Sequence, residues 1–364
     1  MKLISILIPT YNRSNILPDA VNSITKQIES FNLSSSVDII ICNDCSPDDT
    51  SDYLLTLKEQ YIISINRPHN LGMSDNIRTA LKDNCKSEWV LILTDDDTME
   101  ANMLPSILEK CRELSTLDVA ICLTPRYSYL ENGKLHCISC QSFNQDTLIK
   151  PEPISVGQVM SDGFILSGIL LRPEKIDYSM WIENIDNSMF PVIFTGATLQ
   201  NQHGYYWATK IINHTVLNEC FWARWGKNQV DREYRLLCDC IETYSILSRL
   251  YRNDSSDKYN EFWKGATPKI KNIYGFYLSY MPSGMSGLVD SYGLYLASQM
   301  IAKTIFDSHC FWAIFLFIPS NIKYFIKLIA KAILLRRRLK LIDFKTLLAH
   351  FLILIIILVN FKKI

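Results

Sequence analysis

Residues 89–97 read Trp-Val-Leu-Ile-Leu-Thr-Asp-Asp-Asp, an apolar run that ends in three consecutive carboxylates. A short, continuously apolar run is typical of a strand that is buried on both faces of a parallel sheet. Three carboxylates at the end of such a strand are costly to bury unless a cation compensates their charge. We therefore interpret Asp95, Asp96 and Asp97 as a functional cluster. The alternative is an acidic turn that caps the following helix at Asp97 or Thr98.

The strand at 89–93 belongs to a series within the first 125 residues. Buried strands are predicted at 3–8, 37–42, 62–66, 89–93 and 119–123, with helices near 16–30, 49–60, 74–84 and 103–114. Strands that alternate with helices of about ten to fifteen residues predict a Rossmann-like α/β fold, with a mostly parallel sheet covered by helices on both faces. Residues 126–300 show no clear period and favour short strands, followed by helices from about residue 231.

Polar residues follow four of these strands at the point where each strand ends. They occupy positions 9–13, 43–44, 66–67 and 94–97. Because open α/β sheets bind ligands outside the carboxyl ends of their strands, we expect these residues to form one site. Asp44 has two interpretations there: its carboxylate accepts an N–H group of a base, or it closes a local turn.

The acidic cluster predicts a divalent metal ion. Oxygen ligands alone favour Mg²⁺ or Mn²⁺. An ion held in this way would bind the diphosphate of a nucleotide and neutralise its charge. Two Cys-x-x-Cys pairs begin at Cys42 and Cys137, and their separation argues against a ribbon-type zinc site.

Four ordered motifs resemble those of family 2 glycosyltransferases, which have the GT-A fold. They are Ile8-Pro9-Thr10-Tyr11-Asn12-Arg13, Asn43-Asp44-x-Ser46-x-Asp48-Asp49-Thr50, Asn70-Leu71-Gly72 with Asn76, and Thr94-Asp95-Asp96-Asp97. The resemblance covers about residues 1–125 and implies a nucleotide-sugar donor. The last motif is commonly D-x-D-D. Because Thr94 occupies its first position here, the identity of the two metal-binding carboxylates stays open.

The resemblance also implies a role for each matched residue. Thr10 and Asp44 would contact the base, Asp96 would face the ribose or the metal, and Asp97 would be the principal ligand of Mn²⁺ or Mg²⁺. Asp96 and Asp95 are the other assigned metal ligands, and Arg67 and Arg78 are further candidates near the base or phosphates. Because some GT-A enzymes add a late histidine to the metal, His203 and His214 are candidate additional ligands, although a lone histidine is more often structural. The residues assigned to the nucleotide-sugar are Pro9, Thr10, Tyr11, Arg13, Asp44, Asn70, Gly72, Asp95 and Asp96.

Family 2 enzymes are usually inverting and need a carboxylate as general base for the acceptor hydroxyl. In relatives this base often lies in a Glu-Asp pair well after the acidic motif, and this sequence has no such pair at that place. Residues 181–186 offer Glu183 and Asp186, which share one face if the segment is helical. We favour Asp186, with Glu183 and Asp162 as alternatives. The competing interpretation is that these are solvated loop carboxylates.

Two aromatic groups, at 205–207 and 221–225, have two interpretations. They stack on acceptor sugars, or they belong to the hydrophobic core, which we favour. Eleven cysteines without a recognisable secretory signal favour free thiols in a reducing, cytoplasmic setting.

The charge is balanced over the whole chain but not locally. Basic and acidic residues both number 37, which argues against a surface built to coat nucleic acid. Residues 320–364 contain ten basic residues and one acidic residue, a net charge of +9, so residues 1–319 carry −9. Lys323, Lys327 and Lys331 would form one stripe on an apolar helix, which suits an anionic membrane surface. The alternative is a packed helix with snorkelling lysines.

Residues 346–361 form a second apolar segment near the C-terminus, without a formal charge. A spanning helix needs about 20 apolar residues, so this segment favours shallow or monotopic attachment over a soluble packing helix. Whether it spans a thin bilayer stays open.

These features predict three regions. Residues 1–225 would be a GT-A catalytic domain, with a nucleotide-sugar half at 1–125 and an acceptor half at 126–225. Residues 226–308 would be a helical extension, and 309–364 a membrane-associating tail.

We expect a metal-dependent, inverting glycosyltransferase attached to the cytoplasmic face of the inner membrane. It would transfer one sugar to a lipid-linked, polyprenyl-diphosphate glycan in O-antigen or capsule synthesis, with no nucleic-acid partner. The alternative is a non-catalytic sugar-binding or scaffold protein on a degenerate GT-A fold, motivated by the missing Glu-Asp pair and the shifted acidic motif.

Overall fold

The computed structural model describes residues 2–130, 132–216, 229–280, 348, 351, 352 and 355. The chain divides into two compact units, Met1–Asn218 and Glu219–Ile364. The predicted region boundaries after residues 225 and 308 lie outside the described residues, so the division into three regions stays a prediction.

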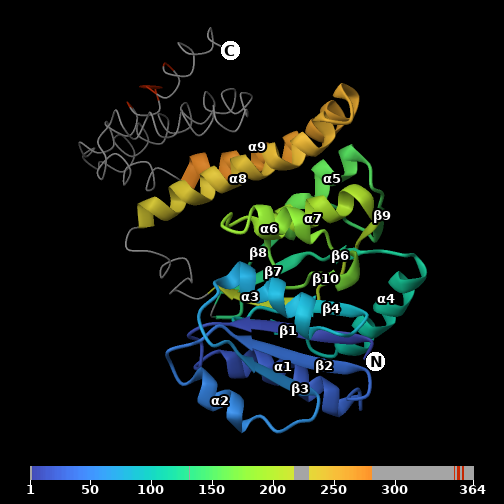
Figure 1. Ribbon diagram of the computed structural model, residues 1–364, viewed down its shortest axis with the longest axis vertical. Coiled ribbons are helices and arrows are strands. Elements are labelled where there is room, and N and C mark those ends of the chain that lie inside the picture. The colour runs from blue at the N-terminus through green and yellow to red at the C-terminus, as the bar shows by residue number, and fades with distance from the viewer. Residues whose placement is uncertain are drawn as a thin grey trace. The chain divides into compact units, whose positions relative to one another are not determined.

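Four parallel strands form one half of the main sheet of the first unit (Figure 1). In sheet order these strands are β3 (Ile62–Asn66), β2 (Val37–Asn43), β1 (Ile4–Thr10) and β4 (Trp89–Ile92). The central strand β1 is buried at every position, because side chains of both its faces pack inside the protein. This explains why its sequence is mostly apolar, with isoleucine, leucine and proline at five of its seven positions. The strands that the sequence predicts at these places are confirmed.

Helices connect these strands and continue beyond β4. They are α1 (Leu17–Ser30), α2 (Thr50–Thr56), α3 (Met73–Thr79), its π-helical extension η1 (Ala80–Asn84), and α4 (Leu104–Thr116). Helix α1 has a proline in its first turn, where the missing N–H group leaves no hydrogen bond unmade. The predicted helices are confirmed, with α2 ending four residues earlier than expected.

The other half of the main sheet is mixed rather than parallel. It adds β10 (Leu170–Leu171), β6 (Ile121–Leu123), β11 (Gly204–Tyr206) and β9 (Thr147–Ile149), in that order after β4. The two-residue strand β10 runs antiparallel to both of its neighbours, and β9 runs antiparallel to β11. The prediction of a mostly parallel sheet therefore holds for the first four strands. The α/β architecture of the GT-A type is confirmed with a mixed sheet.

A second, four-stranded sheet lies within residues 97–216. Its order is β5 (Asp97–Met99), β12 (Ile212–Val216), β7 (Arg126–Leu130) and β8 (Leu135–Ser139). Strand β5 begins inside the acidic cluster and pairs antiparallel with β12, which places Asp97 opposite His214. Short strands after residue 126 are predicted from the sequence, whereas this pairing is not.

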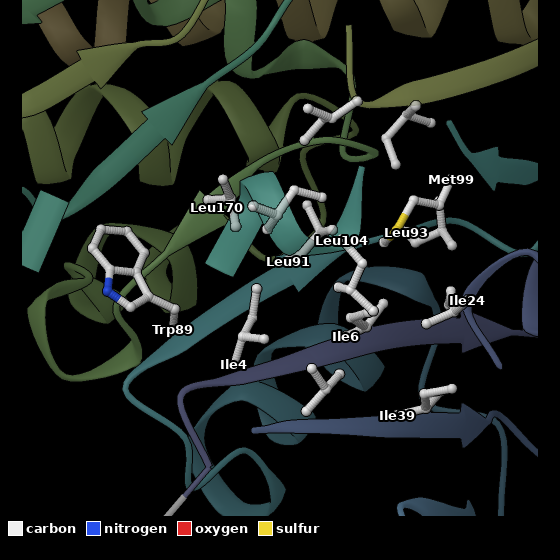
Figure 2. Close-up of a cluster of buried hydrophobic side chains, with 14 of the residues drawn as sticks. Ile4, Ile6, Ile24, Ile39, Trp89, Leu91, Leu93, Met99, Leu104 and Leu170 are labelled. Atoms are coloured by element: carbon white, nitrogen blue, oxygen red, sulfur yellow. The ribbon is translucent and has the colours of Figure 1, made fainter. Parts of the chain in front are cut away.

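The core of the first unit lies between the main sheet and helices α1 and α4 (Figure 2). Ile6 of β1, Ile39 of β2 and Leu91 of β4 are fully buried and pack in one cluster with Ile24 of α1 and Leu104 of α4. Burying one such side chain stabilises the fold by about 1.5–3 kcal/mol. This core fixes the ends of the strands, and with them the loops that carry the polar motifs.

Three more helices, α5 (Pro153–Val159), α6 (Tyr178–Glu183) and α7 (Phe190–Asn201), complete the described part of the first unit, together with the 3-10 turns η2 (Met160–Phe164) and η3 (Pro173–Lys175). Residues 190–199 of α7 are buried on every side, which is typical of a helix that is apolar all round. The ring of Trp181 stacks on Phe194 and Phe190, at centroid distances of 4.7 and 5.3 Å. These contacts join α6 to α7.

In the second unit the structure describes two long helices, α8 (Gln229–Arg252) and α9 (Ser256–Tyr280). They pack against each other, with the rings of Tyr251 and Phe262 5.3 Å apart. Helices from about residue 231 are therefore confirmed. Within the described ranges, no helix has both the length and the apolar character required for a membrane span. The predicted tail helix with Lys323, Lys327 and Lys331 lies outside the described residues, as do most of positions 346–361.

Candidate active site

The polar loops that follow β1, β2 and β3 are joined by backbone hydrogen bonds. Thr10 lies opposite Asn43 in the parallel ladder, and its carbonyl accepts a hydrogen bond from Asp44 N at 3.0 Å. The carbonyl of Asn43 accepts in turn from Arg67 N at 2.9 Å. Pro9 lies inside β1 and is buried, while the Tyr11 side chain is 47% exposed. The three loops therefore form one continuous rim at the carboxyl edge of the sheet.

Asp44 is buried and binds the loop of the third motif. Its two carboxylate oxygens accept hydrogen bonds from Leu71 N at 2.8 Å and Gly72 N at 2.9 Å. The Asn70 side chain donates to the Asp44 carbonyl at 3.2 Å. Gly72 has a φ of +79°, which L side chains rarely adopt, and this explains a glycine where there is space for a Cβ. Asp44 thus holds the residues expected beside the nucleotide, and its own contact with a base stays a prediction.

Asp95 faces the loop that follows β1. Its Oδ1 lies 3.9 Å from Nε of Arg13, and both side chains are mostly buried. Burial, followed by the negative charge of Asp96, raises the pKa of the Asp95 carboxyl to about 7, although Arg13 acts in the opposite direction. The folded protein therefore favours the neutral form of this carboxyl more than water does, which reduces the repulsion among the three aspartates.

Asp97 faces the second sheet instead. Its side chain is fully buried, its Oδ1 contacts Nδ1 of His214, and its Oδ2 accepts a hydrogen bond from Thr94 Oγ1 at 3.0 Å. Arg126 Nη2 lies 3.9 Å from Oδ1. Burial raises the pKa of Asp97, but the hydrogen bond with His214 and the charge of Arg126 outweigh it, so the pKa lies below its ordinary value.

The two candidate histidines have different surroundings. His214 lies in β12 with its side chain 20% exposed beside Asp97, whereas His203 is exposed and precedes β11. The backbone carbonyl of His203 accepts a hydrogen bond from Ala120 N at 2.8 Å. Of the two, only His214 lies beside the acidic cluster.

The arrangement of the three aspartates does not by itself indicate that all three bind one metal ion. In the part of the chain that the structure describes, no three His, Cys, Asp or Glu side chains are grouped so as to hold a metal ion. The chain turns after β4, with Asp97 N bonded to the Thr94 carbonyl, and Asp95 and Asp97 have different partners. Asp97 and His214 are adjacent carboxylate and imidazole donors, a set that suits Mn²⁺ as part of its coordination.

Two residues near the acidic cluster have no signal in the sequence. Ser167 Oγ accepts a hydrogen bond from Thr94 N at 2.9 Å and lies 2.7 Å from Thr94 Oγ1. Arg126, at the start of β7, reaches Asp97 from the second sheet. Both come from segments without a recognisable motif, and only the long-range pairing of strands brings them to the site.

The three candidate bases differ in burial. Asp162 is 3% exposed, and its Oδ2 accepts a hydrogen bond from Ser142 N at 2.9 Å. Glu183 and Asp186 are exposed. The expectation that these two share a helical face is wrong, because α6 ends at Glu183 and the C-cap residue Asn184 leaves the helical conformation.

Helix α6 lies beside the start of α3. Nε1 of Trp181 donates to Ser74 Oγ at 2.8 Å, two residues after Gly72. The segment that carries Glu183 and Asp186 is therefore anchored next to the loop that Asp44 holds.

Several weaker candidates have structural partners. Arg67 Nε donates to Asn76 Oδ1 at 3.1 Å, and Arg78 Nε donates to Asp75 at 2.7 Å. Tyr205, Tyr206 and Trp207 are all buried, which confirms their assignment to the core. The second aromatic group, at 221–225, lies outside the described residues.

The cysteines of the two pairs are free thiols in the structure. Cys42 is buried within β2, and burial raises the pKa of its thiol to about 12, whereas Cys45 is exposed. Such a protonated, buried thiol is unlike a zinc ligand, which binds as thiolate.

Comparison with known proteins gives the family of this region. Residues 5–153 match glycosyl transferase family 2. A GalNAc(5)-diNAcBac-PP-undecaprenol beta-1,3-glucosyltransferase of Campylobacter jejuni is 29% identical over 31% of this chain and 36% of its own length. The abequosyltransferase RfbV of Salmonella typhimurium is 25% identical over 70% of this chain and 78% of its own length.

A third relative is an Escherichia coli UDP-Glc:alpha-D-GlcNAc-diphosphoundecaprenol beta-1,3-glucosyltransferase, WfaP, which is 33% identical over 27% of this chain and 36% of its own length. The chain spans about a third to a half of the first two curated relatives it matches. The crystal structure of TarS 1–349 of S. aureus in complex with UDP-GlcNAc has a TM-score of 0.49 at 18% identity, over 85% of this chain and 89% of that one. The match over residues 5–153 confirms the resemblance of this part of the chain to family 2 glycosyltransferases.

Proposed function

We propose that this protein is a glycosyltransferase that moves one sugar from a nucleotide-sugar to a lipid-linked glycan. The observation that carries the proposal is the joined rim of loops after β1, β2 and β3, with the acidic cluster after the neighbouring strand β4, inside a family 2 domain. The carboxyl edge of a parallel sheet is where α/β folds bind nucleotides.

The donor would bind along this rim. Thr10, Asp44 and the exposed ring of Tyr11 would contact the base, with Arg13 close by, and the loop at Gly72 would border the nucleotide. Asp97 and His214 would hold Mn²⁺ or Mg²⁺, with Asp96 and Asp95 nearby. The bound ion would neutralise the diphosphate as it leaves. The buried, ionised state of Asp97 supports this role, because a carboxylate must be deprotonated to bind a metal.

The reaction would be inverting. A carboxylate would take the proton of the acceptor hydroxyl while the oxygen of that hydroxyl attacks the anomeric carbon. The bond from this carbon to the nucleoside diphosphate would break on the opposite face. Asp186 is our first candidate for this base because it is exposed and lies on the segment anchored beside α3. Glu183 is the second candidate. Asp162 is third, because it is buried and already accepts a backbone hydrogen bond.

The acceptor would be a polyprenyl-diphosphate-linked glycan in O-antigen or capsule synthesis. The names of two relatives support this class, since they contain PP-undecaprenol and diphosphoundecaprenol. An enzyme with this acceptor works where the lipid is, and the basic, apolar region 309–364 would attach the protein to the cytoplasmic face of the inner membrane.

The direct test is a transfer assay with the full chain. The protein is incubated with UDP-, GDP-, dTDP- or CDP-linked sugars and a membrane extract of lipid-linked glycans, with and without Mn²⁺. The masses of the glycans are then measured by mass spectrometry. We expect one donor class to add the mass of a single sugar in a Mn²⁺-dependent manner. Binding of a nucleotide-sugar without transfer or hydrolysis, across all donors, would favour the non-catalytic alternative.

A further inference from the structure

Three consecutive backbone amides of the loop after β1 are held by three side chains from the loop after β2 and the first residue of α2. Asn12 N donates to Ser46 Oγ at 2.9 Å, and Ser14 N donates to Asp48 Oδ2 at 2.9 Å. Between them, Arg13 N donates to Thr50 Oγ1 at 3.4 Å. We call the side chains of Ser46, Asp48 and Thr50 the clasp. Each of the three successive amides therefore has its own acceptor among the clasp residues.

The clasp residues are themselves held in place. Ser46 Oγ donates to Asn43 Oδ1, and Thr50 Oγ1 donates to Asp48 Oδ1 at 2.5 Å. Each hydroxyl therefore has its hydrogen directed away from the loop, and its lone pairs remain available for the amides. Asp48 is central, because one of its oxygens binds Ser14 N and the other orders Thr50.

The loop that the clasp holds has a conformation that needs support. Asn12 has a φ of +58°, in the left-handed region that a non-glycine residue adopts at a cost of about 1 kcal/mol or more. On the far side of the loop, the Arg13 carbonyl accepts hydrogen bonds from Ile16 N at 3.1 Å and Leu17 N at 3.0 Å. The backbone of Arg13 is therefore fixed at both its N–H and its carbonyl group.

This fixed backbone carries the side chain that approaches the acidic cluster. Arg13 is 7% exposed, and its Nε lies 3.9 Å from Asp95 Oδ1. The same loop presents Tyr11 to solvent at the rim. A long arginine side chain loses much rotamer freedom when it is held in one place. A rigid backbone therefore reduces the conformational entropy that is still lost when a ligand binds.

We propose that Asp48, assisted by Ser46, is a positioning residue of the donor site, which acts through the backbone of residues 12–14 to keep Arg13 beside Asp95. The inference rests on the proposed function, since it assumes that a nucleotide donor binds at this rim. Asp48 binds the backbone N–H of Ser14, the residue that follows Arg13. Its effect on donor binding therefore passes through Arg13.

The test is a double-mutant cycle on the full chain. UDP, GDP, dTDP and CDP are screened by calorimetry, and the one that binds the wild type is the probe for Asp48→Ala, Arg13→Ala and the double variant. We expect each single variant to weaken binding about tenfold, which corresponds to one lost charge-assisted hydrogen bond. We expect the double variant to match Arg13→Ala alone, because residues that act as a unit are not additive.

A matched control separates positioning from stability. Asp177 caps α6 by accepting a hydrogen bond from Ser179 N at 3.0 Å. Like Asp48, which accepts hydrogen bonds from Ser14 and Thr50, it stabilises local backbone structure. Asp177 lies outside the motifs at the rim. Asp177→Ala should lower the melting temperature and leave probe binding within about twofold. Asp48→Asn keeps one acceptor oxygen and should restore part of the affinity. If Asp48→Ala is insoluble, Asp48→Asn and Ser46→Ala replace it in the cycle with Arg13→Ala.

Two results would overturn the inference. If the wild type binds the probe and Asp48→Ala binds it as tightly as Asp177→Ala does, the clasp has only a structural role. If the losses from Asp48→Ala and Arg13→Ala simply add, Asp48 does not act through Arg13. Failure of the wild type to bind any nucleotide or to transfer any sugar would instead contradict the proposed function, and the inference with it.

Discussion

Asp97 and His214 lie directly opposite each other in the antiparallel ladder of β5 and β12, with Nδ1 of His214 in contact with Oδ1 of Asp97. The two residues are 117 positions apart in the sequence. Their pairing connects the acidic cluster to a strand of the second sheet. It also gives the candidate metal site an imidazole that the aspartate motif alone does not contain.

His214→Ala should weaken the response to Mn²⁺. Removing this imidazole takes away one donor and the hydrogen bond that lowers the pKa of Asp97. We expect the Mn²⁺ concentration for half-maximal transfer to rise about 10–100-fold, the range found when groups that support a metal are removed. His203→Ala, at an exposed position, is the control. An equal rise in both variants would argue against a role for His214 at the metal.

Asp95→Asn should change the pH dependence of stability. Because the folded protein raises the pKa of Asp95 from its ordinary value of 3.8 to about 7, the folded state favours the neutral carboxyl. The stability that Asp95 contributes is therefore complete below about pH 4 and is lost as the pH rises to about 7. The slope is at most about 1.4 kcal/mol per pH unit for one group.

Urea unfolding of the wild type and of Asp95→Asn between pH 4.5 and 7.5 measures this difference. We expect the variant to gain stability relative to the wild type as the pH rises. Asp52→Asn, at an exposed position of α2, should run parallel to the wild type. A difference between wild type and Asp95→Asn that does not change with pH would contradict the raised pKa.

Asp186→Asn should slow transfer without weakening donor binding. A positioned general base contributes about 10²–10⁴-fold, so we expect kcat to fall by that factor while the Kd of the nucleotide stays within about twofold. Glu183→Gln, also exposed and three residues earlier, is the matched comparison. If Glu183→Gln causes the loss and Asp186→Asn does not, the base is Glu183.

Replacing the three lysines of the predicted tail helix by alanine should weaken membrane binding. Each basic residue near an anionic surface contributes about 1 kcal/mol, so the loss of Lys323, Lys327 and Lys331 should reduce partition to phosphatidylglycerol vesicles about 100-fold. Sedimentation of the full chain with vesicles measures this. The control replaces three exposed lysines of the first unit, Lys58, Lys82 and Lys86. Equal losses in both proteins would show a general charge effect and would contradict a tail-specific contact.

The parallel half of the fold is predictable from the sequence because its strands are buried on both faces. The run Ile39–Cys42 of β2 is almost entirely inaccessible to solvent, so its residues are continuously apolar and the strand is visible without a partner. The polar residues that follow each strand are predictable for the same reason. Their position depends only on where a strand ends.

The remaining part of the site depends on contacts that local sequence does not encode. Ser167 and Arg126 reach Thr94 and Asp97 only because β10 and β7 take their places in the two sheets. Helix α6 ends at Glu183 rather than continuing to Asp186, because Asn184 leaves the helical conformation and its side chain binds the Met180 carbonyl at 2.8 Å. Two residues three positions apart share one face only when both lie within the same helix.

The most direct test of the proposed function compares the full chain with Asp97→Ala, with Asp52→Ala as the matched carboxylate control. Sugar transfer and Mn²⁺-dependent nucleotide binding are measured for all three proteins. We expect Asp97→Ala to lose transfer by at least about 100-fold and to bind the nucleotide equally with and without Mn²⁺, while Asp52→Ala matches the wild type. Unchanged transfer and unchanged Mn²⁺-dependent binding in Asp97→Ala would contradict the assignment of this site.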